Sequence, residues 1–176
     1  MSVAGFVLGL VATVLAVASL IWQFFGFRKR PEAKLTPVVG LLTPDGVVTS
    51  DAGNDARESL QNAAARFPEG RFVIGVKVVN TGRAPLHVAS WAIRIGPNGT
   101  SLQPTRASGL EVPHDIPVGE TAVLLTELQH VQRFVSAAEG AASQPPRIVL
   151  SVSSGARTYL TGPVAPGLLS LRSGSA

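Results

Sequence analysis

The segment RFVIGVKVVN (residues 71–80) decides the fold class of this chain. Every second position in it is apolar, and these positions are Phe72, Ile74, Val76 and Val78. Successive side chains of a strand point to opposite faces of a sheet, so a period of two predicts a half-buried β-strand. We therefore expect a domain built around a β-sheet.

The chain before this segment predicts a hairpin followed by a short helix. Thr36 to Leu42 and Gly46 to Thr49 look like two strands, and the turn residues Pro44, Asp45 and Gly46 lie between them. Asn54 is a candidate cap for a helix whose apolar side is Ala56, Leu60, Ala63, Ala64 and Phe67. Pro68 and Gly70 are expected to end that helix.

The chain after the segment predicts another long strand, from Pro85 to Ile95. Its second half places Trp91, Ile93 and Ile95 on one face, whereas Leu86 and Val88 follow the opposite phase. A bulge or twist between Val88 and Trp91 would reconcile the two halves in one strand.

The remaining chain predicts one long loop, further strands and a second helix. Residues 96–119 are rich in Pro, Ser and Gly and are expected to form a loop with one or two short edge strands. Strands are expected at Glu120 to Leu125, at Ile148 to Val152 and at Arg157 to Thr161. The capping-box pattern of Thr126 to Gln129 predicts a helix that ends at Gly140.

About seven short strands with polar turns predict a mostly β fold, a β-sandwich with one or two short helices in its connections. The run VVNTGRAPLHV (residues 78–88) resembles the strand-turn-strand of immunoglobulin-like and fibronectin-like modules. The whole chain resembles uncharacterised small single-pass membrane proteins of high-GC bacteria. Cysteine is absent, so the disulfide-bonded antibody type is excluded.

An uncharged segment at the N-terminus predicts a transmembrane helix. Val3 to Phe27 would span about 37 Å at ~1.5 Å per residue, enough to cross a hydrocarbon core with some tilt. Trp22 and several phenylalanines precede Arg28, Lys29 and Arg30, the order expected where a helix leaves the lipid. The domains are therefore 1–27 (transmembrane helix), 28–35 (basic juxtamembrane linker), 36–162 (β-sandwich) and 163–176 (flexible tail).

The basic residues also predict the orientation, because Lys and Arg near a helix end prefer the cytoplasmic side. All of them follow the helix, so we expect a plasma (inner) membrane protein with a cytoplasmic domain. A cleaved signal peptide is the competing interpretation, because Ala16-Val17-Ala18 has the small-x-small form of a cleavage site. Two features oppose it: the n-region has no Lys or Arg, and the apolar run continues beyond the site.

One side of the predicted helix carries small residues at heptad spacing. The seam consists of Gly5, Gly9, Ala12, Ala16, Ser19 and Gln23. Small seams allow helix backbones to approach closely in lipid, which favours self-association or pairing with another membrane helix. An Ala- and Gly-rich composition also fills many helix positions with small residues, so the seam can equally reflect composition alone.

The charge distribution argues against nucleic-acid binding. The net charge is +4, but residues 28–34 carry +3 of it, and from Leu35 onward 11 basic residues face 10 acidic ones. The basicity belongs to the membrane border, where cations meet anionic headgroups.

A search for reactive groups identifies no catalytic, cofactor-binding or metal site. His87, His114 and His130 have no metal-binding spacing, and no nucleophile elbow, P-loop or dinucleotide glycine pattern occurs. Glu111, Asp115 and Glu120 share one loop region, where solvated charges are the simpler interpretation.

Three functions fit these observations. The first is a membrane-anchored, non-catalytic module that binds a protein partner through the loop of residues 96–119 and the strand edge beside it. The second is a membrane effector whose helices assemble through the small seam. The third is an extracytoplasmic ligand-binding or adhesion module, released by cleavage at Ala18. No enzyme activity, cofactor or nucleic-acid partner is expected.

Overall fold

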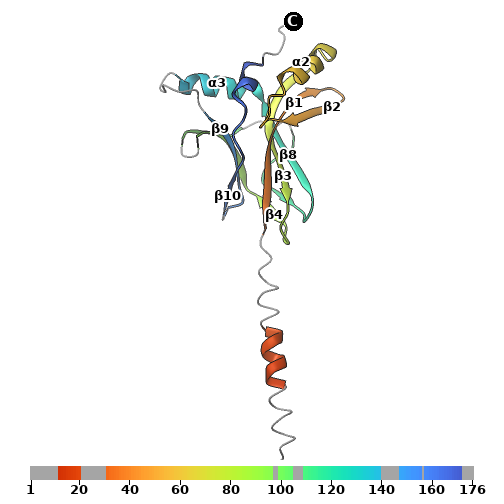
Figure 1. Ribbon diagram of the computed structural model, residues 1–176, viewed down its shortest axis with the longest axis vertical. Helices are drawn as coiled ribbons and strands as arrows, with labels where there is room; N and C mark the ends of the chain where they lie inside the picture. Colours follow the sequence, from red (N-terminus) through yellow and green to blue (C-terminus); the bar gives the residue numbers. More distant parts are fainter. Residues whose placement is uncertain are drawn as a thin grey trace, which may run out of the picture.

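The computed structural model describes residues 12–20, 31–96, 99–104, 109–139, 147–155 and 157–171. Within these residues the chain is mostly β, with antiparallel sheets and a few short helices (Figure 1). The strands are β1 (Ala33–Thr43), β2 (Gly46–Asp51), β3 (Arg71–Asn80), β4 (Leu86–Val88), β5 (Ser90–Ile95), β6 (Ser101–Leu102), β7 (His114–Ile116), β8 (Thr121–Glu127), β9 (Ile148–Ser153) and β10 (Thr158–Leu160). The helices that follow β1 are α2 (Arg57–Arg66), α3 (Leu128–Glu139) and the 3-10 helix η1 (Pro166–Ser170).

The described strands form three sheets around one main core. The larger sheets have the orders β2-β1-β3-β8 and β10-β9-β5-β6, and β4 pairs with β7 in a third. Buried residues of both larger sheets share one apolar cluster, for example Ile74 on β3 with Trp91 on β5 and Leu150 on β9. In Figure 1 these two sheets lie opposite each other, β1 begins at the lower end, and α2, α3 and η1 lie at the upper end. The expected mostly β class is confirmed.

The predicted hairpin and the central strand are present, but β3 is more deeply buried than its pattern suggested. Phe72 to Val76 are all buried, including Val73, which points away from the main core. Val73 belongs to a second, small cluster with Val38 and Leu125 of the flanking strands β1 and β8. The half-buried prediction holds at Arg71 and Lys77, which are exposed, and fails at Val73 because β1 and β8 place apolar side chains beside it.

The strand expected from Pro85 to Ile95 is two strands in different sheets, which corrects the predicted bulge. β4 pairs with β7, whereas β5 pairs with β9 and β6. Ala89 lies between the two strands and donates its N–H to the carbonyl oxygen of Ser153 at 2.8 Å. The change of phase between Val88 and Trp91 therefore marks the point where the chain crosses from one sheet to another.

Both predicted helices exist, but their first residues differ from the expected caps. Ala56 is the N-cap of α2 and provides no side-chain cap, so Asn54 does not cap this helix. Phe67 is 41% exposed and does not share the buried side of Leu60. Thr126 lies within β8, and α3 begins two residues later at Leu128, so the capping-box prediction misplaced the helix start.

The C-terminal segment packs into the core as far as Leu171, in contrast to the expected flexible tail. Val164, Leu168 and Leu171 are buried in the main cluster. Gln132 on α3 donates from Nε2 to the carbonyl oxygens of Leu169 (2.8 Å) and Leu171 (2.6 Å). These contacts bring residues 163–171 into the β domain.

Only part of the predicted membrane segment is described. Residues 12–20 form a helix, and all of them are exposed. Among the described residues, no helix has both the length and the apolar character needed to cross a membrane. The rest of the predicted span, residues 3–11 and 21–27, lies outside the described residues.

Candidate functional site

Two hollows flank the edge strand β6, within the loop region that the sequence marked for partner binding. The larger one, here named the α3 groove, has a volume of about 610 Å³ and is lined by Leu102, Gln103, Pro104, Thr126, His130, Arg133 and Phe134. The smaller one, here named the serine trough, has a volume of about 180 Å³ and is lined by Ser90, Trp91, Ala92, Arg94, Ser101, Gln103, Ser151, Ser153 and Thr158. Gln103 lines both, so the two hollows are neighbours at this residue and together form the candidate site.

The α3 groove exists because one side of α3 is fixed in the core. Leu128, Val131 and Val135 are buried, and their spacing of three and four residues places them on one side of the helix. His130 and Arg133 are exposed on the other side, and Phe134 is half-buried between them. The groove therefore combines an apolar floor with basic and polar groups at its rim.

The serine trough is the outer face of the β10-β9-β5-β6 sheet. Strand register brings Thr158, Ser153 and Ser90 into one cross-strand row, and Ser151 and Ala92 into the next. Arg94 is opposite Ser101 in a third row. The small side chains leave a shallow hollow, whereas the alternate residues of β5 and β9, such as Ile93 and Leu150, fill the core.

Hydrogen bonding within the trough is incomplete. Ser151 Oγ donates to the Ala92 carbonyl oxygen at 3.2 Å, and Ser153 Oγ accepts from the Gly155 N–H at 3.3 Å. Nε1 of Trp91 and Nε of Arg94 are buried, and neither donates to any described residue. Trp91 is only 3% exposed, so water does not readily replace an acceptor there.

The electrostatics of both hollows favour an anionic group. Their lining contains Arg94 and Arg133 but no Asp or Glu. The ion pairs of the described residues lie elsewhere and join Asp55 with Arg57, Arg71 with Glu127, and His87 with Asp115. Arg94 thus presents a positive charge that no described carboxylate neutralises.

The structure brings His87 and Asp115 together, which sequence reasoning missed. Nδ1 of His87 lies 2.6 Å from Oδ1 of Asp115, because the two residues are directly opposite in the β4–β7 pair. Both side chains are more than half exposed, so this is a surface pair of small energetic weight. No described contact joins Asp115 to Glu111 or Glu120, and the described residues contain no group of three metal-ligating side chains.

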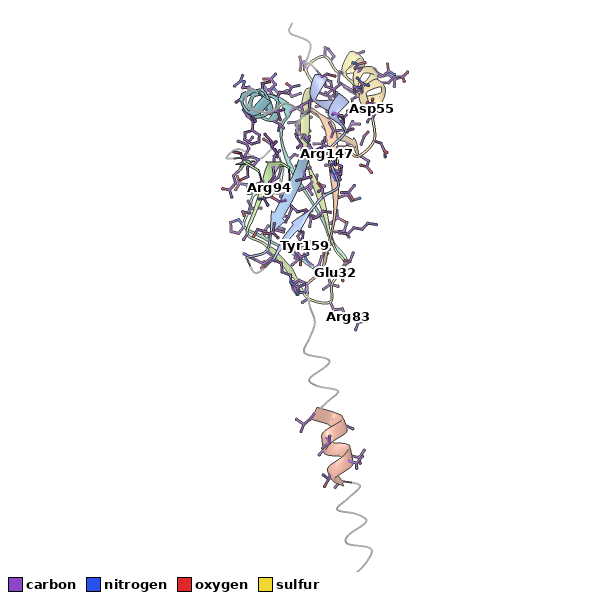
Figure 2. All side chains as sticks on the ribbon, turned by 60° about the vertical axis from the view of Figure 1, so that its left-hand side comes forward. Glu32, Asp55, Arg83, Arg94, Arg147 and Tyr159 are labelled. Atoms are coloured by element: carbon purple, nitrogen blue, oxygen red, sulfur yellow. The ribbon has the colours of Figure 1, made fainter. Side chains whose placement is uncertain are left out.

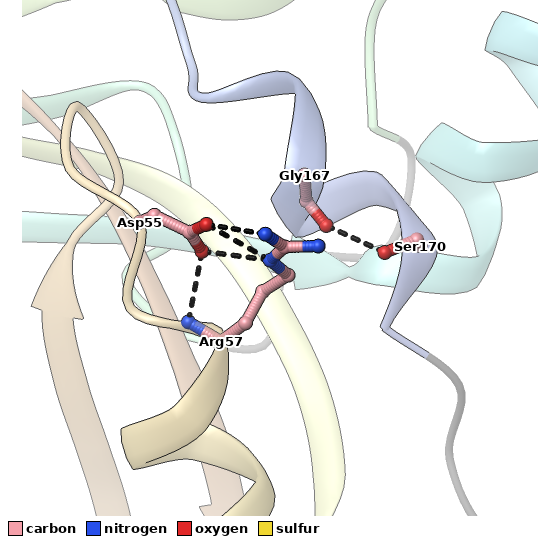
Figure 3. Close-up of polar contacts among 4 residues, drawn as sticks. All are labelled: Asp55, Arg57, Gly167 and Ser170. Carbon is pink, nitrogen blue, oxygen red and sulfur yellow. Dashed lines mark hydrogen bonds and ion pairs between the residues drawn. The ribbon is translucent and has the colours of Figure 1, made fainter.

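Outside the hollows, an ion pair at the start of α2 lies beside the C-terminal segment (Figure 3). Arg57 donates from Nε and Nη2 to the carboxylate of Asp55, with a shortest distance of 2.6 Å. The side-chain hydrogen bond from Arg57 lowers the pKa of Asp55, and the same bond raises the pKa of Arg57. Because both groups are exposed, the pair lies on the surface and offers no enclosed site.

Most residues of the predicted membrane site lie outside the described residues. This applies to Gly5, Gly9, Trp22, Gln23, Arg28, Lys29 and Arg30. The seam residues Ala12, Ala16 and Ser19 lie in the described helix, and all three are exposed.

Sequence reasoning identified the loop of the candidate site but neither hollow. The serine trough could have been predicted from the sequence, because Ser151 and Ser153 alternate with the apolar residues of one strand and therefore share its polar face. The groove had none, since it depends on how α3 packs beside β6. Comparisons with protein-family models, curated proteins and solved structures found no match to this chain.

Proposed function

We propose that the chain is a membrane-anchored, non-catalytic module that binds a protein partner at the two hollows beside β6. The observation that carries this proposal is that the α3 groove and the serine trough both lie beside the edge strand β6 and share Gln103 in their linings. The lining offers apolar surface, hydroxyl groups and two arginines that form no ion pair with a described residue, and such groups support recognition of a partner. The size of the α3 groove is also in the range of natural ligand sites.

The membrane anchor is the second part of the proposal. It is supported by the uncharged segment from Val3 to Phe27 and by the exposure of Val14 (60%), Leu15 (65%) and Leu20 (65%). Exposed apolar side chains in such a row are unfavourable in water and favourable in lipid. The basic residues after the segment favour a cytoplasmic domain at the inner membrane.

The anchor is tested by fractionating cells that produce the full-length chain. We expect the protein in the membrane pellet, with release by detergent and not by alkaline carbonate. Val14→Lys combined with Val17→Lys should move it toward the soluble fraction, because each charge is costly at the bilayer centre. Recovery of the unmodified chain without detergent would refute the anchor. Sequencing the N-terminus of the purified protein distinguishes the anchored form, which keeps residues 1–18, from the form cleaved at Ala18. A reporter fused to the C-terminus shows on which side of the membrane the domain lies.

The partner site is tested by photo-crosslinking in cells. A photoreactive residue at Gln103 lies between the two hollows, and one at Asp45, in the exposed β1–β2 turn, is the matched control. We expect a reproducible protein adduct from position 103 and none of the same mass from position 45. Identical adducts from both positions, or none from position 103, contradict the proposed site.

We also propose that the anchor pairs with another helix through its small seam. The support is the spacing of the seam, whose described members Ala12, Ala16 and Ser19 are four and three residues apart. Gly9→Ile and Ala16→Ile should lower association in a transmembrane-helix reporter assay, whereas Val14→Ile, off the seam, should not. Unchanged association in both seam variants refutes the pairing.

The immunoglobulin-like character of the domain is likewise a proposal. Two facing antiparallel sheets and the buried Trp91 on β5 support it. An experimental structure in which the strand connections follow a different order would contradict it.

A further inference from the structure

Among the described residues, no strand pairs with the edge of β6 that faces away from β5. β6 is the last strand of its sheet and pairs with β5 alone among the described strands. The Ile95 N–H donates to the Thr100 carbonyl oxygen at 3.1 Å, so Arg94 and Ser101 form the next, non-hydrogen-bonded pair. The backbone N–H and C=O of Ser101 consequently point away from β5, toward the open side.

The two hollows lie on opposite faces of this edge. Ser101 is opposite Arg94 and lines the serine trough on the outer face. Leu102 is opposite the fully buried Ile93, packs against the core and lines the α3 groove. A strand placed beside β6 would direct alternate side chains to these two faces, because its period is two.

The trough selects a negatively charged acceptor. The Nε of Arg94 is buried without an acceptor among the described residues, and no acidic side chain lines the trough. No described side-chain hydrogen bond involves the hydroxyl groups of Ser90, Ser101 or Thr158. A guanidinium surrounded by hydroxyl donors binds a carboxylate through charge-assisted hydrogen bonds. A volume of about 180 Å³ accommodates one side chain and not a whole ligand.

The α3 groove selects an apolar side chain on the opposite face. Its floor contains Leu102 and Phe134, and Thr126 at its base is almost fully buried. Arg133 at the exposed rim adds a second positive charge, which again disfavours a basic partner. Pro104 follows Gln103 and has no N–H, so the backbone pairing is limited to a short segment.

We propose that β6 accepts a short, extended segment of a partner protein as an additional strand, with an acidic side chain against Arg94 and an apolar side chain in the α3 groove. This inference rests on the proposed function for its protein partner. Backbone hydrogen bonds along the edge supply affinity, and the alternate hollows supply specificity. The acidic and apolar positions are one or three residues apart, since they lie on opposite faces of the added strand.

The test selects peptides of eight random residues, displayed on phage, against the full-length chain in detergent micelles. Arg94→Gln is the site variant, and Arg147→Gln is the matched control, because Arg147 is exposed, carries the same charge and lines neither hollow. Figure 2 shows Arg94 and Arg147 at separate places on the domain, both well above Glu32 and Arg83. We expect selected peptides to combine an Asp or Glu with an apolar residue one or three positions away.

The affinities of a selected peptide then test the predicted contacts. Arg94→Gln should weaken binding by about tenfold or more, as expected for loss of one partner of a hydrogen-bonded charge pair, and Arg147→Gln should leave it unchanged. Replacing the acidic residue of the peptide by its amide should weaken binding to the unmodified chain but not to Arg94→Gln. Methylating one backbone nitrogen of the peptide at a time should abolish binding at every second position only, because every second N–H of an added strand faces β6.

Thermal unfolding separates loss of contact from loss of structure. Arg94→Gln should unfold at the same temperature or higher, because it removes a buried donor that has no acceptor. Arg94→Lys, which keeps the charge and loses the planar fork, should fold and bind with intermediate affinity.

Several outcomes overturn this inference. They are selected peptides without an acidic residue, equal affinity for Arg94→Gln, tolerance of backbone methylation at every position, and Arg94-dependent binding to vesicles of anionic lipid in place of peptides. A crosslinked partner at position 103 that persists in Arg94→Gln would overturn the inference and keep the proposed function. Loss of every adduct at position 103 in the unmodified chain would instead refute the proposed function.

Discussion

The guanidinium of Arg57 covers Gly167: a Cβ atom built on Gly167 would lie 2.9 Å from both Cζ and Nε of Arg57. The same guanidinium is held by the carboxylate of Asp55, as Figure 3 shows. The start of α2 and the 3-10 helix near the C-terminus are therefore joined through a single arginine. A side chain at position 167 would displace the guanidinium, because the Cβ atom would lie within 3.0 Å of it.

A substitution at Gly167 should consequently change the titration of Asp55. The pKa of Asp55 is lowered by its hydrogen bonds from Arg57, so this carboxylate stabilises the fold above the ordinary carboxyl pKa of about 3.9. That contribution is lost as the pH falls through the lowered, folded-state pKa. Gly167→Val should raise the titration midpoint of Asp55 toward its ordinary value, as measured by NMR of the side-chain carboxyl carbon.

The control for this experiment is Gly162→Ala, because a Cβ atom at Gly162 meets no atom within 4 Å. It should leave the midpoint of Asp55 in place. An unchanged midpoint in Gly167→Val would show that Arg57 keeps its contact with Asp55 when the glycine is lost.

Gly75→Ala should be strongly destabilising. A Cβ atom at this central position of β3 would overlap the Leu124 carbonyl oxygen on β8. Backbone atoms on a paired strand cannot move aside as a flexible side chain can, so the sheet itself would have to shift. We expect a loss of more than about 3 kcal/mol in the free energy of unfolding, measured by chemical denaturation of the full-length chain.

Gly162→Ala is again the comparison for the Gly75 substitution. It lies in open space, so reduced freedom of the unfolded chain should make it neutral or stabilising by up to about 1 kcal/mol. Similar losses in both variants would contradict the close strand approach at Gly75.

Asn80→Ala should separate the third sheet from the end of β3. The buried Nδ2 of Asn80 donates to the carbonyl oxygens of Ala84 and Ile116, both at 2.9 Å, and its Oδ1 accepts from the Gly82 N–H at 3.0 Å. Removing the amide leaves these buried backbone groups without partners, which costs about 2 to 4 kcal/mol. Asn62→Ala, on the exposed side of α2, should cost nothing, and hydrogen exchange near Ile116 should rise in Asn80→Ala alone.

Leu168→Ala should destabilise the whole domain, although Leu168 lies close to the C-terminus. Its side chain is fully buried in the main cluster, so we expect a loss of about 2 to 5 kcal/mol in thermal or chemical unfolding. Leu169→Ala, at a partly buried neighbouring position, should cost less. Equal and small effects at both positions would restore the expectation of a loose tail.

Local sequence patterns determined several of the strands and helices of this protein. The alternation in residues 71–80, the turn residues Pro44 to Gly46 and the helical spacing from Val131 to Ala138 each predicted an element that the structure contains. Such patterns report the local environment of a segment, because burial of one face fixes which positions are apolar. They also pointed to the loop of residues 96–119, which supplies Ser101 to Pro104 of the lining of the candidate site.

Tertiary structure alone decided the pairing of these elements. The phase change at Ala89 is compatible with a bulge in one strand or with a change of sheet. The structure decides for a change of sheet, because β4 pairs with β7 and β5 pairs with β9. The core position of Leu168, the pair of His87 with Asp115, and the two hollows beside β6 likewise join residues that are far apart in the chain. The physical reason is that long-range contacts depend on the mutual fit of several elements, and no local period records that fit.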